Sequence, residues 1–249
     1  MKIIIIGGSG LIGTKLIKML KSLGHTAIGA SPSSGVDATT GKGLAEALKE
    51  AQVVVDVSNS PSFDEKAALE FFEKSSHNLA IAEKEAGVKH HIVLSIIGTG
   101  QLANSGYFRA KHTQEQLTKT SGIPYTIVQS TQFYEFLNGI AQSATIGQMV
   151  HLPPVLFQPI AADDVAAILT DIVIRPPLNH TIEIAGPERA RFPELIQRYL
   201  KATQDPRKVI TDNDAHYFGM ALTEDSLIPK KKNPQLGSTT LESWLHLRK

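Results

Sequence analysis

A short β-branched run that ends in a glycine-rich turn constrains the fold of this chain more than any other feature. Residues 2–6 read KIIII and predict a buried strand, while residues 7–13 read GGSGLIG. An amphipathic helical pattern begins inside the turn and ends at Gly24. A strand, a glycine-rich turn and a helix in this order bring backbone N–H groups and the positive end of a helix together. This arrangement can bind a pyrophosphate group.

The glycines of the turn have the spacing G-x-x-G-x-x-G and, from Gly8, also G-x-G-x-x-G. A side chain at the close-approach glycine would hold a pyrophosphate away, and one at Gly13 would push the helix from the sheet. We therefore expect the turn to bind a dinucleotide, although such a turn can also serve tight packing alone. The expected binding residues are Gly7, Gly10, Leu11, Ile12 and Gly13.

Strand-like and helical segments alternate through the first half of the chain. Strands are expected at 26–30, 53–57, 91–96 and 125–130, and helices at 64–86 and 108–120. Alternation of this kind is typical of βαβ units, which form a parallel sheet with helices on both faces. The predicted fold class is α/β, with a doubly wound, mainly parallel sheet of the Rossmann type.

The pattern changes after Ser130, where aromatic residues and proline-rich loops precede the remaining elements. These elements are expected as a helix at 164–174, a strand at 181–186 and a helix at 193–202. Loops of this composition commonly form substrate pockets. The chain is predicted to be one NAD(P)-binding domain over 1–249, in which 132–160 and 187–249 form a small C-terminal substrate-binding lobe.

Charge and composition favour a small-molecule substrate. The 25 basic and 24 acidic side chains are scattered and give a net charge of +1, so no binding of nucleic acid or of an anionic membrane is expected. The chain has no cysteine, which excludes disulfides and thiolate sites and fits a cytoplasmic location. Because the adjacent His90 and His91 point to opposite faces of a strand, no metal site is expected. We expect a monomer or a homodimer.

The end of the second predicted strand bears on the choice of dinucleotide. An NAD-specific site usually places an acidic residue there, which binds the ribose 2′-hydroxyl. Here Ser31, Ser33 and Ser34 offer hydroxyl groups and no carboxylate repels a 2′-phosphate, so NADP(H) is favoured over NAD(H). No arginine or lysine attracts that phosphate either. Asp37 fits adenine recognition and an ordinary turn equally well.

A tyrosine and a lysine four residues apart are the candidate catalytic pair. Tyr107 and Lys111 lie on one face of a predicted helix, so they can share a site. A tyrosine has a pKa near 10, and a nearby ammonium group lowers it toward the range useful for proton transfer. Ser95 ends the strand HIVLS, where side chains of open α/β sheets point into the ligand crevice. Tyr107 and Lys111 alone could also be an ordinary surface pair.

These segments together resemble the short-chain dehydrogenase/reductases, specifically the atypical, NmrA-like branch of NAD(P)H-binding proteins. The likeness runs through GGSGLIG, YFRAKHTQEQL, SGIPYTIVQSTQFYEF, PIAADDVA and IEIAGPE. It implies that Tyr107 is the acid/base, that Lys111 bonds the nicotinamide ribose and lowers the pKa of Tyr107, and that Ser95 orients the substrate. It also implies that Ser58 and Asn59 lie along the cofactor.

The expected function is that of an NADP(H)-dependent oxidoreductase, which transfers hydride to or from a small carbonyl or quinone. Phe133, Tyr134 and Phe136 are candidates for the wall of an apolar substrate pocket, with core packing as the alternative. The resembling branch also contains proteins that bind a dinucleotide as a signal without turnover, which is the first alternative function. A nucleotide-sugar epimerase or dehydratase, which shares the glycine spacing, is the second.

Overall fold

The computed structural model describes residues 1–62, 64–100 and 105–247. Its main sheet has seven strands in the order β12-β9-β5-β4-β3-β1-β2. These strands are β1 (Lys2–Ile6), β2 (Thr26–Ala30), β3 (Val53–Asp56), β4 (His90–Ile96), β5 (Tyr125–Ser130), β9 (Thr181–Ala185) and β12 (Gln235–Leu236). Strand β1 pairs in parallel with β2 and β3, β3 with β4, and β9 with β12. The predicted mainly parallel sheet is confirmed.

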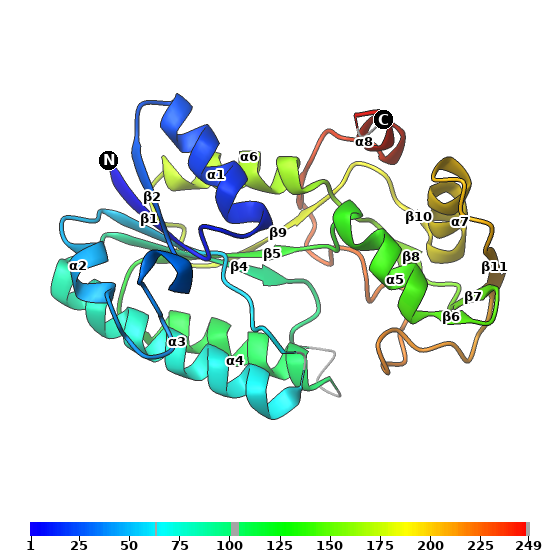
Figure 1. Cartoon of the computed structure of the whole chain (residues 1–249), viewed down its shortest axis with the longest axis horizontal. Helices are drawn as coiled ribbons and strands as arrows, with labels where there is room; N and C mark the ends of the chain where they lie inside the picture. Colours follow the sequence, from blue (N-terminus) through cyan, green and yellow to red (C-terminus); the bar gives the residue numbers. More distant parts are fainter. Residues whose placement is uncertain (63, 101–104, 248–249) are drawn as a thin grey trace. The chain divides into compact units, whose positions relative to one another are not determined.

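Helices cover both faces of this sheet, as a doubly wound fold requires. The helices are α1 (Leu11–Ser22), α2 (Leu44–Leu48), α3 (Glu65–Ala86), α4 (Gly106–Thr120) and α6 (Ala162–Val173). Figure 1 shows α1 and α6 on one face and the packed pair α3 and α4 on the other. The strands between them are buried on both faces. In β1, side chains alternate between the two faces, and the consecutive residues Ile3, Ile4 and Ile5 are all fully buried.

Local signals place the ends of these helices close to the predicted boundaries. Asp64 caps α3 by accepting a hydrogen bond from the backbone N–H of Ala67, and Gly87 ends the helix in the left-handed conformation. Helix α6 begins with Asp163 and Asp164 in its first turn, as expected for acids near the positive helix end. Asp164 also accepts hydrogen bonds from the N–H and hydroxyl groups of Thr239.

The chain divides into two compact units. Unit 1 comprises 1–129 and 165–182, and unit 2 comprises 130–164 and 183–249. Both segments predicted to form a substrate lobe, 132–160 and 187–249, lie within unit 2. Among the described residues, no helix is both long and apolar enough to cross a membrane.

Unit 2 contains short strands and helices around an aromatic core. Its further elements are β6 (Thr145–Ile146), β7 (Met149–Leu152), β8 (Leu156–Phe157), β10 (Ala190–Arg191), β11 (Lys208–Thr211), α5 (Leu137–Ser143), α7 (Phe192–Ala202) and α8 (Leu241–His246). Strands β11, β7 and β6 form one small sheet, and β10 pairs with β8. The rings of Phe157 and Phe192 lie 4.4 Å apart between their centroids, inside this unit.

Candidate active site

The glycine-rich turn joins β1 to α1 and exposes the positive end of the helix. Gly7 has a positive φ of 78° and donates its N–H to Ala30 O at 2.9 Å. Gly10 is the N-cap residue of α1, and neither a side-chain cap nor an acidic residue neutralises the first turn. The partial positive charge of the helix end therefore remains available for an anion.

Close backbone packing explains why this turn needs glycine. A Cβ atom at Gly13 would overlap the carbonyl oxygen of Gly7 and lie 2.7 Å from Gly8 Cα. One at Gly8 would overlap Gly29 Cα in β2. Gly8 and Gly29 were not among the predicted binding residues. Their contact lets the turn approach the edge of β2.

The three predicted hydroxyl residues after β2 form a single turn of 3-10 helix, η1 (Pro32–Ser34), together with its N-cap. Ser31 N–H donates to Ser34 Oγ at 3.0 Å, and the hydroxyls of Ser31 and Ser33 lie 2.9 Å apart. Ser33 and Ser34 are exposed, so these groups remain predicted ligands of the ribose phosphate. Asp37 accepts hydrogen bonds from the N–H and hydroxyl of Thr39, and the hydroxyl is the main reason that the pKa of Asp37 is lowered. This is the geometry of an ordinary turn aspartate.

The loop after β3 lies between the glycine-rich turn and Tyr107. A Cβ at Gly7 would stand 2.9 Å from Ser58 Cα, so the turn and this loop are in contact. Asn59, the next residue, accepts a hydrogen bond of 2.7 Å from the Tyr107 hydroxyl. Within the described part of the chain, the buried Ser58 Oγ has no hydrogen-bond partner. An unpaired buried hydroxyl on a loop that contacts the glycine-rich turn fits a dinucleotide phosphate.

Tyr107 lies in the first turn of α4 and is a protonated phenol at neutral pH. Burial raises the pKa of Tyr107 to about 12, and the hydrogen bond to Asn59 opposes this shift. Such a phenol holds a proton that it can donate, although the raised pKa makes it a weaker acid than a free tyrosine. To accept one near neutrality, it requires nearby positive charge, which stabilises the phenolate.

Lys111 lies one turn further along α4 and is almost fully buried. Its ammonium group donates to Leu94 O at 2.9 Å and to Gln114 Oε1 at 2.5 Å. It also lies 4.7 Å from the centre of the Phe72 ring, within the range of a cation–π contact. Burial lowers the pKa of Lys111 to about 8, although the carboxylates of Asp56 and Glu115 act in the opposite direction. The hydrogen bond to a nicotinamide ribose stays a prediction.

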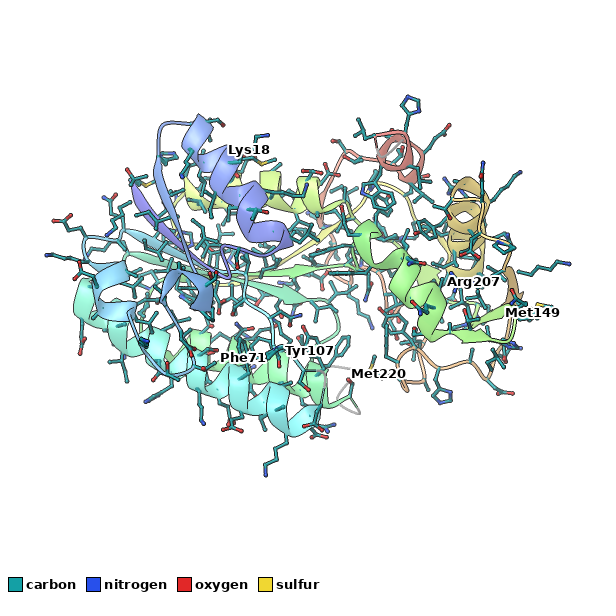
Figure 2. The ribbon with its side chains drawn as sticks, viewed as in Figure 1. Lys18, Phe71, Tyr107, Met149, Arg207 and Met220 are labelled. Carbon is teal, nitrogen blue, oxygen red and sulfur yellow. The ribbon has the colours of Figure 1, made fainter. Side chains whose placement is uncertain are left out.

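Phe72 on α3 brings Tyr107 and Lys111 onto one surface. The Phe72 and Tyr107 rings meet edge to face at 6.2 Å between their centroids. Phe71 and Tyr107, both packed on the Phe72 cluster, are labelled beside one another in Figure 2. The predicted shared face of Tyr107 and Lys111 is therefore present, with a buried aromatic ring as its floor.

Ser95, at the end of β4, is bound to a buried carboxylate. Its hydroxyl donates to Glu115 Oε1 at 2.5 Å. Glu115 also accepts from the Thr99 hydroxyl at 3.1 Å and from the Gln129 amide at 2.9 Å. Because the single proton of Ser95 is directed to Glu115, its oxygen is left as an acceptor. Sequence reasoning missed Glu115, since a polar residue in a polar helix carries no signal of burial.

The predicted pocket aromatics all lie in unit 2 and differ in exposure. Tyr134 is fully buried, and its ring contacts that of Trp244 at 5.5 Å. Phe133 and Phe136 stack at 5.5 Å, and Phe136 is exposed. Tyr134 is thus part of the unit 2 core, and a substrate contact by any of the three stays a prediction.

The histidine pair forms two separate contacts. His90 Nε2 lies 2.9 Å from the Thr126 hydroxyl, whereas His91 Nδ1 lies 2.6 Å from Glu83 Oε1. Among the described residues, no group of three or more His, Cys, Asp or Glu side chains is arranged to hold a metal ion.

The buried ammonium of Lys111 predicts a specific dependence of stability on pH. Its pKa is about 8 in the folded chain and near 10.4 when unfolded, so between these values the unfolded chain binds more protons. Folding stability should therefore rise with pH across this window. Between pH 7.5 and 10, the free energy of unfolding of the wild type should gain about 2 kcal/mol relative to Lys111→Met. Urea denaturation of both proteins measures this, and parallel pH curves would contradict it.

Comparison with known proteins defines the class to which this fold and site belong. The sequence profile of an NAD(P)H-binding family matches residues 7–176, from the glycine-rich turn to just beyond α6. The chain belongs to this NAD(P)H-binding family. The predicted membership of an NAD(P)H-binding family is thereby confirmed.

Two curated proteins and a solved structure show similarity over most of the chain. The photosystem II assembly factor Ycf39 of Synechocystis sp. is 23% identical over 79% of this chain and 66% of its own length. The chloroplastic divinyl chlorophyllide a 8-vinyl-reductase of Cucumis sativus is 26% identical over 77% of this chain and 54% of its own length. This chain thus spans about half to two thirds of these relatives. A dTDP-4-dehydrorhamnose reductase from Bacillus anthracis, solved with NADP, shares the fold with a TM-score of 0.68 at 14% identity, over 99% of this chain and 92% of that one.

Proposed function

We propose that this protein is an NADP(H)-dependent oxidoreductase that acts on a small carbonyl or quinone substrate. The observation that carries the proposal is the hydrogen bond from Tyr107 to Asn59. It attaches a protonated phenol to the loop that contacts the dinucleotide turn at Gly7. All of these groups lie in unit 1.

Each residue of the site has a distinct role in this proposal. The turn from Gly7 to Gly13 binds the diphosphate, and Ser58 offers its free hydroxyl to the same cofactor. When bound, the nicotinamide supplies or accepts the hydride. Tyr107 donates its phenolic proton to the substrate oxygen in reduction and takes it back in oxidation. Ser95 orients the substrate in this proposal, which requires its hydroxyl proton to turn from Glu115 to the substrate oxygen.

Two observations support NADP(H) over NAD(H). The turn after β2 presents the exposed hydroxyls of Ser33 and Ser34, and no carboxylate stands among residues 31–34. A ribose 2′-phosphate would therefore meet the Ser33 hydroxyl without a repelling charge, whereas the Ser34 hydroxyl donates to Ser31 O at 2.9 Å and would have to turn to reach it. The structurally similar reductase from Bacillus anthracis was solved with NADP.

Titration with NADP⁺, NADPH, NAD⁺ and NADH tests the cofactor assignment directly. We expect the phosphorylated forms to bind about tenfold more tightly, equivalent to about 1.4 kcal/mol, as one or two hydroxyl–phosphate hydrogen bonds would give. Turnover of a panel of small carbonyls and quinones with the preferred cofactor then tests the reaction. No association with any of the four at millimolar concentration would refute both the cofactor and the reaction.

A cofactor-sensing protein is the second candidate function. It is favoured by the internal partners of two predicted catalytic side chains, since Ser95 binds Glu115 and Lys111 binds Gln114. The similarity to an assembly factor agrees with it. Unequal affinity for the oxidised and reduced dinucleotide, with no turnover across the panel, would support sensing over catalysis.

A further inference from the structure

A chain of hydrogen bonds connects Lys111 with the loop that binds Tyr107. Lys111 donates to Gln114 Oε1 at 2.5 Å, and Gln114 Nε2 donates to Asp56 Oδ2 at 2.8 Å. The other oxygen of Asp56 accepts the backbone N–H of Ser58 at 2.9 Å. Ser58 precedes Asn59, the hydrogen-bond partner of Tyr107. The polar chain therefore begins on α4 at Lys111 and returns to α4 at Tyr107.

Gln114 is the link between the two charged members of this chain. An ammonium group only donates and a carboxylate only accepts, so the amide has one orientation that satisfies both. Asp56, Lys111 and Gln114 are each less than 5% exposed. A buried polar network in which every member has its partner holds one geometry, whereas a member left unpaired is costly. The network is thus suited to fixing side-chain positions.

We propose that Gln114 is a positioning residue of the active site, which holds the charge of Lys111 and the Asn59 loop in fixed places around Tyr107. This inference rests on the proposed function, because it takes Tyr107 as the proton donor. Lys111 and Tyr107 both contact Phe72, so the place of one ammonium group is defined relative to the phenol. Gln114 accepts a hydrogen bond from Lys111 and so holds the ammonium group. It also donates to Asp56, which binds the backbone of the loop that contains Asn59.

Burial and two nearby carboxylates set the pKa of Lys111, while the neutral amide of Gln114 accepts its hydrogen bond. The charged groups near Lys111 are Asp56 from β3 and Glu115 from α4, while α3 contributes the Phe72 ring and β4 the Leu94 carbonyl. No carboxylate bonds the ammonium directly among these contacts, and burial lowers the pKa of Lys111 to about 8. The ammonium group to which the proposed function assigns the assistance of Tyr107 is therefore charged at neutral pH and neutral above about pH 8, which predicts an alkaline decline of turnover there.

Exchanging the amide and the carboxylate tests the proposal. Gln114→Glu alone faces a second carboxylate toward Asp56, and Asp56→Asn alone weakens the bond to Gln114. The double variant restores every hydrogen bond, because the new amide at position 56 can donate to the new carboxylate at position 114, and that carboxylate can accept from Lys111. We expect each single variant to lose about tenfold or more in kcat/KM at pH 7, and the double variant to recover to within about threefold.

The pH profile separates positioning from mere structural support. In the double variant Lys111 bonds a carboxylate directly, so the alkaline decline should move up by about one pH unit. The pH-dependent rise in unfolding free energy should move with it, and this readout requires no turnover. Restored activity with both pH responses unchanged, or no recovery in the double variant, would overturn the proposal. The proposed function and the role of Gln114 can fail separately. If the wild type shows no turnover but the pH dependence of unfolding still shifts in the double variant, the proposed function is refuted and the contact of Gln114 with Lys111 is supported.

The helix offers a matched control for these variants. Gln116 lies on the exposed face of α4, so Gln116→Glu makes the same chemical change outside the network. It should leave kcat/KM within about twofold and the alkaline decline in place, as surface substitutions usually do. A loss of kcat/KM equal to that of Gln114→Glu would attribute the effect of that variant to net charge and overturn the role of Gln114.

Discussion

Tyr107→Phe is expected to lower turnover by about 10²- to 10⁴-fold, because it removes the proton that the proposed reaction requires. The variant deletes one oxygen and keeps the ring that packs on Phe72. Its lost hydrogen bond to Asn59 lies at the reacting end of the site, so the dissociation constant of the cofactor should change by no more than about threefold. Steady-state kinetics and a fluorescence titration measure the two quantities.

Tyr125 supplies a matched control for this substitution. Tyr125 is the first residue of β5. It therefore lies at the opposite edge of the sheet from the site residues that lie at the ends of β3 and β4. Tyr125→Phe makes the same chemical change and should leave turnover within about twofold, as expected for a position outside the site. Full turnover in Tyr107→Phe would remove Tyr107 from the mechanism and leave the sensing function as the better candidate.

Gly13→Ala should weaken dinucleotide binding by about 10²-fold or more. The added Cβ would overlap the Gly7 carbonyl oxygen, and both it and Gly8 Cα are backbone atoms that no rotamer change can move. Helix α1 must then shift from the turn, and two or three charge-assisted hydrogen bonds to the diphosphate, each worth about 1.5 kcal/mol or more, are lost or lengthened. Calorimetric titration with the preferred dinucleotide measures the affinity.

The same glycine-to-alanine change in open space is the control. Gly139 lies in α5, and a Cβ there meets nothing within 4 Å. Gly139→Ala should keep the cofactor affinity and change the stability slightly upward, because alanine favours a helix by up to about 1 kcal/mol. A folded Gly13→Ala protein with unchanged affinity would show that the glycine-rich turn serves packing and that the cofactor binds elsewhere.

The parts of the fold that were predicted correctly depend on local patterns. Helix α3 begins after an aspartate cap and ends before a glycine in the left-handed conformation, and both signals are local. Strands β1 and β3 are continuous β-branched runs, and the fold buries both of their faces. The short strands β6, β8 and β10 were not predicted, since two residues carry no periodicity.

Only those site residues that belong to a single sequence motif could be predicted. The spacing of Tyr107 and Lys111 placed them on one helix face, and the turn at Gly7 indicated the diphosphate. The buried partners of Lys111 and Ser95 were missed, because they lie on neighbouring positions of α4 and read as ordinary polar helix residues. Gln114 contacts Asp56, which is 58 positions earlier in the chain. No local pattern predicts such a contact.

The sequence by itself therefore determined the strand–turn–helix that can receive a diphosphate, the parallel α/β class and the helix face shared by phenol and ammonium. The first and last of these follow from backbone geometry over a few consecutive residues, and the fold class follows from the alternation of such local patterns along the chain. Only the tertiary structure decided where the ammonium and the serine proton point, because those directions depend on Gln114 and Glu115 of α4 and on the groups of β3, β4 and β5 that bind around them. Burial makes those partners decisive, since a polar group shielded from water must bind whatever the fold places beside it.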